Sequence, residues 1–167
     1  MAAESWRLEE TRPGDAVAIQ NLQRRCYLAC DVFKMYQLRH ILHSPTCRGL
    51  AIRGPDHTVL GNVLGLMRRF VIPSGRIYNI VVAPELQGRG AASQLLLAME
   101  AIFVAAGMRD SYAEIRQSNA ASRALFARNG YREIGPLPRY YPDGEDGVKV
   151  LKNLTGAGAT PNSIRCK

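Results

Sequence analysis

The chain has 167 residues and a formal charge of +8, a length that predicts one domain with a real hydrophobic core. No apolar run reaches the length of a membrane span, so we expect no membrane partner. The segment from Met1 to Arg7 lacks the basic and then apolar pattern of a secretion signal, so we expect a cytoplasmic protein.

The basic and metal-ligating side chains show no pattern typical of a nucleic-acid or metal site. Arg24-Arg25 and Arg68-Arg69 are scattered pairs without interleaved aromatic residues. We therefore expect the positive potential to attract an anionic cofactor and expect no direct nucleic-acid binding. The four cysteines and three histidines lack metal-ligand spacing, so we expect no metal. Buried free thiols in a reducing compartment are the better interpretation of the cysteines.

The first half of the chain alternates between strand and helix patterns. Val17, Ile19 and Leu22 begin an apolar repeat at helical spacing, and Pro45 closes a second helix that follows Asp31. In chain order we expect a strand at 6–10, a helix from 16 to about 30, a helix at 32–44, a strand from 49 that turns at 54–57, and antiparallel strands at 59–71 and 76–82.

The second half begins with a helix that is apolar nearly all round, which we expect to lie deep against the sheet. In chain order we expect this helix at about 89–106, a strand at 110–116, a helix from the Asn119 cap to 129, strands at 131–135 and 148–151, and a loop at 136–147. The globular domain is expected to span 1–154. Residues 155–167 are polar and patternless, which predicts a disordered tail.

A glycine-rich corner joins the strand at 79–82 to the long helix. Gly88 and Gly90 let a ligand approach the backbone, and the first N–H groups of a helix have no partner inside it. Those donors, with Arg89, would suit a phosphate. A tight turn alone remains equally possible. Ala91-Ala92 after Gly90 exclude a P-loop, whereas a dinucleotide fingerprint nearly fits.

The corner carries a more specific pattern, Gln87-x-x-Gly90-x-Ala92. It resembles the acetyl-CoA pyrophosphate motif of the GCN5-related N-acetyltransferase (GNAT) superfamily. The runs at 114–131 and 139–146 resemble the ribosomal-protein-alanine N-acetyltransferase branch. The resemblance covers about residues 76–151.

This resemblance implies a single α/β (α+β) domain with a mixed, mostly antiparallel sheet flanked by helices. The sheet would be splayed at the acetyl-CoA site, where the strand backbone pairs with the pantetheine arm. The residues implied to bind the cofactor are Ile80, Val81, Val82, Gln87, Gly88, Arg89, Gly90, Ala91, Ala92, Ser93, Asn119 and Phe126.

The implied reaction is the direct transfer of acetyl to an amine, which must lose a proton before it attacks. Glu114 matches the catalytic glutamate of the branch, and Tyr78 matches a tyrosine that could orient a water. Without the family, Glu114 would be interpreted as a carboxylate paired with Arg116. An α-amine titrates near 7.7–8.0 and lysine near 10.4, so a carboxylate is better matched to an N-terminal amine.

The chain departs from the family at Phe126, where the pattern usually has a tyrosine that protonates the departing thiolate. Its ring could pack beside the cofactor or belong simply to the core. Another hydroxyl, such as that of Tyr131 or Tyr78, could replace the missing acid.

The sequence favours acetyl-CoA-dependent acetylation of a protein N-terminus. Tyr27, Phe33, Tyr140 and Tyr141 are expected to line an aromatic acceptor groove. A small-molecule amine acetyltransferase and a catalytically impaired acetyl-CoA-binding protein remain alternatives, the latter suggested by Phe126.

Overall fold

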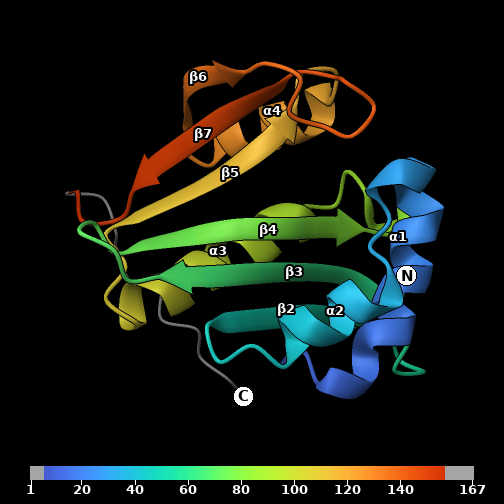
Figure 1. Cartoon of the computed structure of the whole chain (residues 1–167). Coiled ribbons are helices and arrows are strands. Elements are labelled where there is room, and N and C mark those ends of the chain that lie inside the picture. Colours follow the sequence, from blue (N-terminus) through green and yellow to red (C-terminus); the bar gives the residue numbers. More distant parts are fainter. Residues whose placement is uncertain (1–5, 157–167) are drawn as a thin grey trace.

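The structure is a computed structural model that describes residues 6–156, and Figure 1 shows its seven-stranded sheet. The strand order is β1-β2-β3-β4-β5-β7-β6. The strands are β1 (Arg7–Glu10), β2 (Cys47–Arg53), β3 (Val59–Arg68), β4 (Ser74–Val82), β5 (Asp110–Arg116), β6 (Arg132–Leu137) and β7 (Gly147–Asn153). The predictions for residues 1–5 and for 157–167 of the tail lie outside the described residues.

Helices cover both faces of the sheet. They are α1 (Ala16–Cys26), α2 (Met35–Leu42), α3 (Ala91–Ala105) and α4 (Ala120–Arg128). In Figure 1, α1 and α2 lie in front of the sheet, and α3 and α4 lie behind it. Among residues 6–156, no helix is long and apolar enough to cross a membrane.

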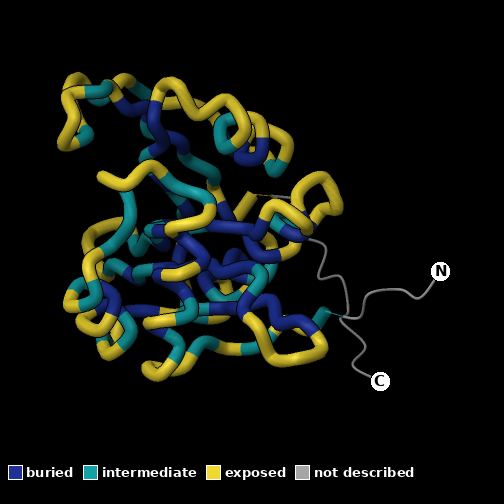
Figure 2. The backbone as a smooth tube through the Cα atoms, turned by 90° about the vertical axis from the view of Figure 1, so that its right-hand side faces the viewer, coloured by how far each residue is buried: buried dark blue, intermediate teal, exposed yellow. Residues whose placement is uncertain are grey.

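The main core lies between α3 and the central strands. Leu95, Met99 and Phe103 of α3 are fully buried, as the apolar helix pattern predicts. A Cβ added at Gly75 of β4 would collide with the ring of Phe103, so this glycine allows the helix to approach the sheet. Figure 2 shows the buried residues concentrated inside the sheet and helix layers and the exposed ones along the connecting loops.

The sheet opens between β4 and β5. All strand pairs are antiparallel except this one, which is parallel and holds only from Ser74–Arg76 to Asp110–Tyr112. Both strands continue beyond their last paired residues, and Figure 1 shows β5 diverging from β4 there. The prediction of a mostly antiparallel sheet splayed along 80–82 is therefore confirmed.

Several predicted boundaries are wrong by a few residues. The first helix ends at Cys26, where Tyr27 is extended, and a 3-10 turn at Ala29–Asp31 delays α2 to Met35. β3 ends at Arg68, before an exposed turn at 70–72. β6 extends through Pro136, which is tolerated because β6 is an edge strand.

Candidate functional site

A β-bulge in β4 places two consecutive side chains on the same face of the sheet. Leu64 of β3 pairs with Asn79, and Gly65 pairs with Ile77, so Tyr78 is the extra residue. Tyr78 packs against the cluster formed with α1 and α2, and Asn79 also faces α1, where its Oδ1 lies 3.3 Å from Gln23 Nε2. Without the bulge, one of these two side chains would point to the α3 side.

Two glutamines of α1 hold the segment that follows this helix. Gln20 Nε2 donates to the backbone oxygen of Phe33 at 2.8 Å, and the backbone N–H of Phe33 donates to Gln23 Oε1 at 3.0 Å. The Tyr27 hydroxyl lies 2.7 Å from the backbone oxygen of Ile80 and 2.8 Å from Asn79 Oδ1. The connection between α1 and α2 is thereby fixed against β4.

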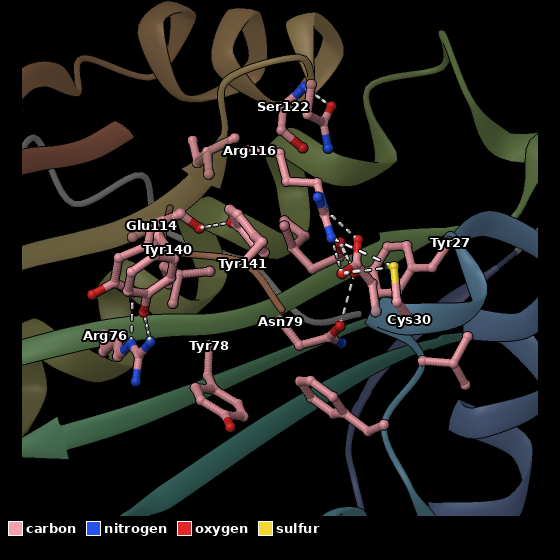
Figure 3. A pocket seen from close by; sticks show the side chains of 18 of the residues that line it. Tyr27, Cys30, Arg76, Tyr78, Asn79, Glu114, Arg116, Ser122, Tyr140 and Tyr141 are labelled. Carbon is pink, nitrogen blue, oxygen red and sulfur yellow. Dashed lines mark hydrogen bonds and ion pairs between the residues drawn. The ribbon is translucent and has the colours of Figure 1, made fainter. Parts of the chain in front are cut away.

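A cavity of about 430 Å³ lies where β4 and β5 diverge (Figure 3). Its walls come from the α1–α2 connection, both strands, α4 and the β6–β7 loop. The predicted site residues that line it are Tyr27, Phe33, Tyr78, Ile80, Glu114, Asn119, Phe126, Tyr140 and Tyr141. The structure thus brings together the predicted catalytic and acceptor residues with three of the predicted cofactor residues.

Glu114 is paired with Arg76, not with Arg116 as the alternative interpretation expected. Arg76 Nε donates to Glu114 Oε2 at 2.8 Å, and both side chains are mostly buried. Arg76 Nη2 also donates to the Tyr140 hydroxyl at 3.1 Å, and its guanidinium lies 4.9 Å from the centre of the Tyr78 ring. The ion pair orients the carboxylate beside two tyrosines, as Figure 3 shows.

Arg116 joins the two walls of the cavity. Its side chain is 6% exposed and contacts Asp31 at 2.6 Å, Asp143 at 2.8 Å and Glu145 at 2.7 Å. The guanidinium also lies 4.1 Å from the centre of the Tyr141 ring. Asp31 belongs to the α1–α2 connection and the other partners to the β6–β7 loop. We call this cluster the Arg116 bridge.

The charge of the bridge and the burial of the tyrosines fix protonation states. The hydrogen bond from Arg116 holds the pKa of Asp143 below its usual value. Burial raises the pKa of Tyr140 and raises that of Tyr141 to about 12. Both hydroxyls therefore stay protonated at neutral pH and can donate hydrogen bonds. The Tyr141 hydroxyl donates to the backbone oxygen of Glu114 at 3.3 Å.

The glycine-rich corner lies outside the cavity lining, at the N-terminus of α3. Gly88 and Gly90 have φ of +75° and +80°, and Gly90 is the N-cap of the helix. No described atom lies within 4 Å of a Cβ built on either glycine, apart from its chain neighbours. Gln87 Nε2 donates to the Val82 backbone oxygen at 3.2 Å and ties the corner to β4. The space beside both glycines is therefore open at the N-terminus of α3, which fits the approach of a phosphate group to the backbone.

Several of the predicted cofactor residues also have structural contacts. Val81, Val82 and Ala91 are buried in the core. Ser93 Oγ accepts a hydrogen bond from Asn129 Nδ2 at 3.1 Å, which links α3 to the end of α4. The Asn119 side chain accepts from the backbone N–H of Ser122 and caps α4, as predicted.

Phe126 is both a core residue and part of the cavity wall. Its side chain is 2% exposed, and its ring meets that of Tyr131 edge-on with the centres 4.8 Å apart. The Tyr131 hydroxyl is buried against Ser111 Oγ at 2.6 Å, and Tyr131 does not line the cavity. Of the two tyrosines proposed to replace the missing acid, Tyr78 lines the cavity and Tyr131 does not.

Sequence reasoning missed several residues of the site. Arg76, Arg116, Asp31, Cys30, Gln37 and Ser122 also line the cavity. The alternation of β5 placed Arg116 on the same side as Glu114, which was the available signal. Among residues 6–156, no cluster of three or more potential ligands could hold a metal ion.

Residues 16–131 match the profile of the acetyltransferase (GNAT) family. The chain belongs to the GNAT family. An uncharacterised N-acetyltransferase from Methanocaldococcus jannaschii is 35% identical over 103 residues, which cover 61% of the chain and 64% of that relative. An N-alpha-acetyltransferase from Sulfurisphaera tokodaii is 31% identical over 85 residues, which cover 50% of the chain and 51% of that relative. Both matches span less than two thirds of the relative's length.

Solved structures support the GNAT fold across nearly the whole chain. The ribosomal-protein-S18-alanine N-acetyltransferase from Escherichia coli superposes with a TM-score of 0.77 at 19% identity and covers 93% of this chain and 98% of that one. The predictions of the superfamily and of the single α/β domain are confirmed.

Proposed function

We propose that this GNAT protein is an acetyl-CoA-dependent N-acetyltransferase that acts on the α-amine of a protein N-terminus. The observation that carries this proposal is the cavity at the opening of the sheet. It brings Glu114 of β5 together with Asn119, the N-cap of α4, and with Phe126 of α4.

The chain's own residues fit acetyl-CoA. The open space beside Gly88 and Gly90 would let a pyrophosphate approach the backbone at the N-terminus of α3, and Gln87 fixes the corner. The stretch of β4 from Ile80 to Val82 pairs with β3 but not with β5, and its β5-facing edge would lie along the pantetheine arm, flanked by Asn119 and Phe126. When bound, acetyl-CoA supplies the acetyl group as a thioester.

Glu114 would accept the proton that the amine loses as it attacks, either directly or through one water that Tyr78 orients. The ion pair with Arg76 at 2.8 Å holds the carboxylate in place for this role. An N-terminal amine suits this site because its pKa of about 7.7–8.0 leaves roughly a tenth of it deprotonated at pH 7, whereas a lysine amine with a pKa of about 10.4 is deprotonated to less than about a thousandth.

An extended polypeptide fits the acceptor side of the cavity. Phe33 and Tyr78 lie with their ring centres 5.2 Å apart, and Tyr140 and Tyr141 lie 5.3 Å apart on the opposite wall. The Arg116 bridge holds both walls. These aromatic surfaces support a peptide acceptor over a small polyamine.

Phe126 favours one alternative, a catalytically impaired acetyl-CoA-binding protein. Phenylalanine cannot protonate the departing thiolate. However, a free thiol titrates near 8.5, so a thiolate leaves tolerably at neutral pH without a proton donor. We therefore propose that the protein keeps acetyltransferase activity although position 126 is a phenylalanine.

Release of free thiol from acetyl-CoA tests the proposal. The assay compares N-terminal peptides with spermidine and an aminoglycoside. We expect the highest kcat/KM for a peptide. A higher value for a small amine would support a small-molecule acetyltransferase, and acetyl-CoA binding without thiol release would support the impaired protein.

We also propose a cytoplasmic location and a domain that spans 1–154, with a tail after it. Cys26, Cys30 and Cys47 are free, which is consistent with a reducing compartment. Fractionation of the source cells would test the location, and limited proteolysis would test the boundary.

A further inference from the structure

A second hollow lies beside the proposed active site, against α2. It has a volume of about 460 Å³ and is lined by Tyr36, Gln37, His40, Ile41 and Tyr78. Gln37 and Tyr78 line the first cavity as well. The two spaces are therefore adjacent and share the Tyr78 side chain as a wall.

This shared wall is held in place by its neighbours. Tyr78 is the bulged residue of β4, with the Phe33 ring 5.2 Å from its own and the Arg76 guanidinium 4.9 Å from its centre. These contacts keep the ring between the two spaces. A chain that leaves the first cavity past Tyr78 meets the α2 hollow next.

The chemistry of the hollow suits an apolar side chain. Tyr36 is 66% exposed, and Ile41 of the same helix adds an aliphatic side chain to the lining. Residues 34–43 contain Lys34, Arg39, His40 and His43 but no acidic residue, so a cationic side chain would find no partner on this segment. A single exposed tyrosine is ordinary on a protein surface. Tyr36, however, lies beside the acceptor cavity, where it can contact an acceptor that extends out of that cavity.

We propose that the α2 hollow is a specificity subsite for an aliphatic or aromatic side chain of the acceptor polypeptide, downstream of the acetylated residue. This inference rests on the proposed function. Arg76 links Glu114, at 2.8 Å, to the Tyr78 ring, whose centre is 4.9 Å from the guanidinium. An extended chain advances about 3.3 Å per residue, so the side chain that passes Tyr78 belongs to the second to fourth residue. A small amine ends in the first cavity and does not reach the subsite.

Peptides that differ only by leucine or serine at positions two, three and four test the subsite. We expect wild type to prefer leucine at one of these positions by about tenfold in kcat/KM, mainly through KM. In Tyr36→Ser this preference should fall below about twofold, while alaninamide should be acetylated at the wild-type rate. Leu97→Ser is the matched control, because Leu97 is also exposed (51%) but lies on α3. It should retain the preference.

The outcomes separate the subsite from the proposed function. If wild type acetylates peptides without preferring leucine at any of the three positions, or if Tyr36→Ser retains the preference, the subsite is wrong and the proposed function stands. If wild type acetylates only small amines, the subsite and the proposed function are both wrong. Thermal melting of Tyr36→Ser should match wild type, because the side chain is mostly exposed.

Discussion

Replacing Glu114 with glutamine separates its proposed role as a base from its structural role. The amide keeps the size of the side chain and an oxygen that can still accept from Arg76 Nε, now 2.8 Å from Glu114 Oε2. Arg76 also keeps its contacts with Tyr140 and the Tyr78 ring. We therefore expect Glu114→Gln to fold and to lose only about 1 kcal/mol of stability. General base catalysis contributes about a hundred- to ten-thousand-fold.

The expected result is a fall in kcat of at least about a hundredfold, which corresponds to about 2.7 kcal/mol of transition-state stabilisation. Calorimetry should give an unchanged Kd for acetyl-CoA. Arg76→Gln is the matched control, because it removes the ion pair and leaves the carboxylate. It should lower kcat by much less than Glu114→Gln does. Equal losses in the two variants, or an unchanged pH–rate profile in Glu114→Gln, would refute the assignment of Glu114 as the base.

Three further predictions address the cofactor corner, the leaving group and the Arg116 bridge. Gly90→Glu should weaken acetyl-CoA binding at least about tenfold in calorimetry, because Gly90 is left-handed (φ +80°) and its side chain would occupy the phosphate position. Gly107→Glu, with φ +78° at the other end of α3, should bind as wild type, and equal binding by both variants would refute the site. Phe126→Tyr should raise kcat if no acid operates and change it little if Tyr78 is the acid; inactivity of both proteins on every amine would favour the binding-only alternative. Arg116→Gln should raise KM for peptides and leave the Kd of acetyl-CoA unchanged, and an unchanged KM would contradict the bridge's role. Since Arg116 lowers the pKa of Asp143 in the folded protein, the bridge should stabilise the fold above about pH 4, and this stabilisation should be lost as pH falls through the lowered pKa. Thermal melts of wild type and Arg116→Gln across this pH range would measure the effect.

Local sequence patterns predicted several of the elements around the site. β5 spans the predicted 110–116, Asn119 caps α4, and α3 is buried as its apolar pattern required. These features depend on side-chain alternation, capping and hydrophobicity over a few neighbouring residues. The corner at Gly88 and Gly90 was predictable for the same reason, because only glycine adopts left-handed φ without strain.

Long-range contacts explain what the sequence did not predict. Arg116 is bonded to Asp31 and Asp143, which lie far apart in the chain, and no local pattern specifies those partners. Glu114 takes Arg76 from the neighbouring strand because β4 and β5 run parallel side by side up to that point. The bulge at Tyr78 depends on its register with β3, so it too required the folded sheet.

The position of the transferred acetyl group tests the central claim most directly. The purified protein is incubated with acetyl-CoA and a peptide that carries both a free N-terminus and an internal lysine, and tandem mass spectrometry locates the product. We predict acetyl on the α-nitrogen, with one free thiol released for each acetyl group transferred and little of either with Glu114→Gln. Acetylation of the lysine alone, or no acetylated peptide while a small amine is acetylated, would contradict the assignment of an N-terminal acetyltransferase.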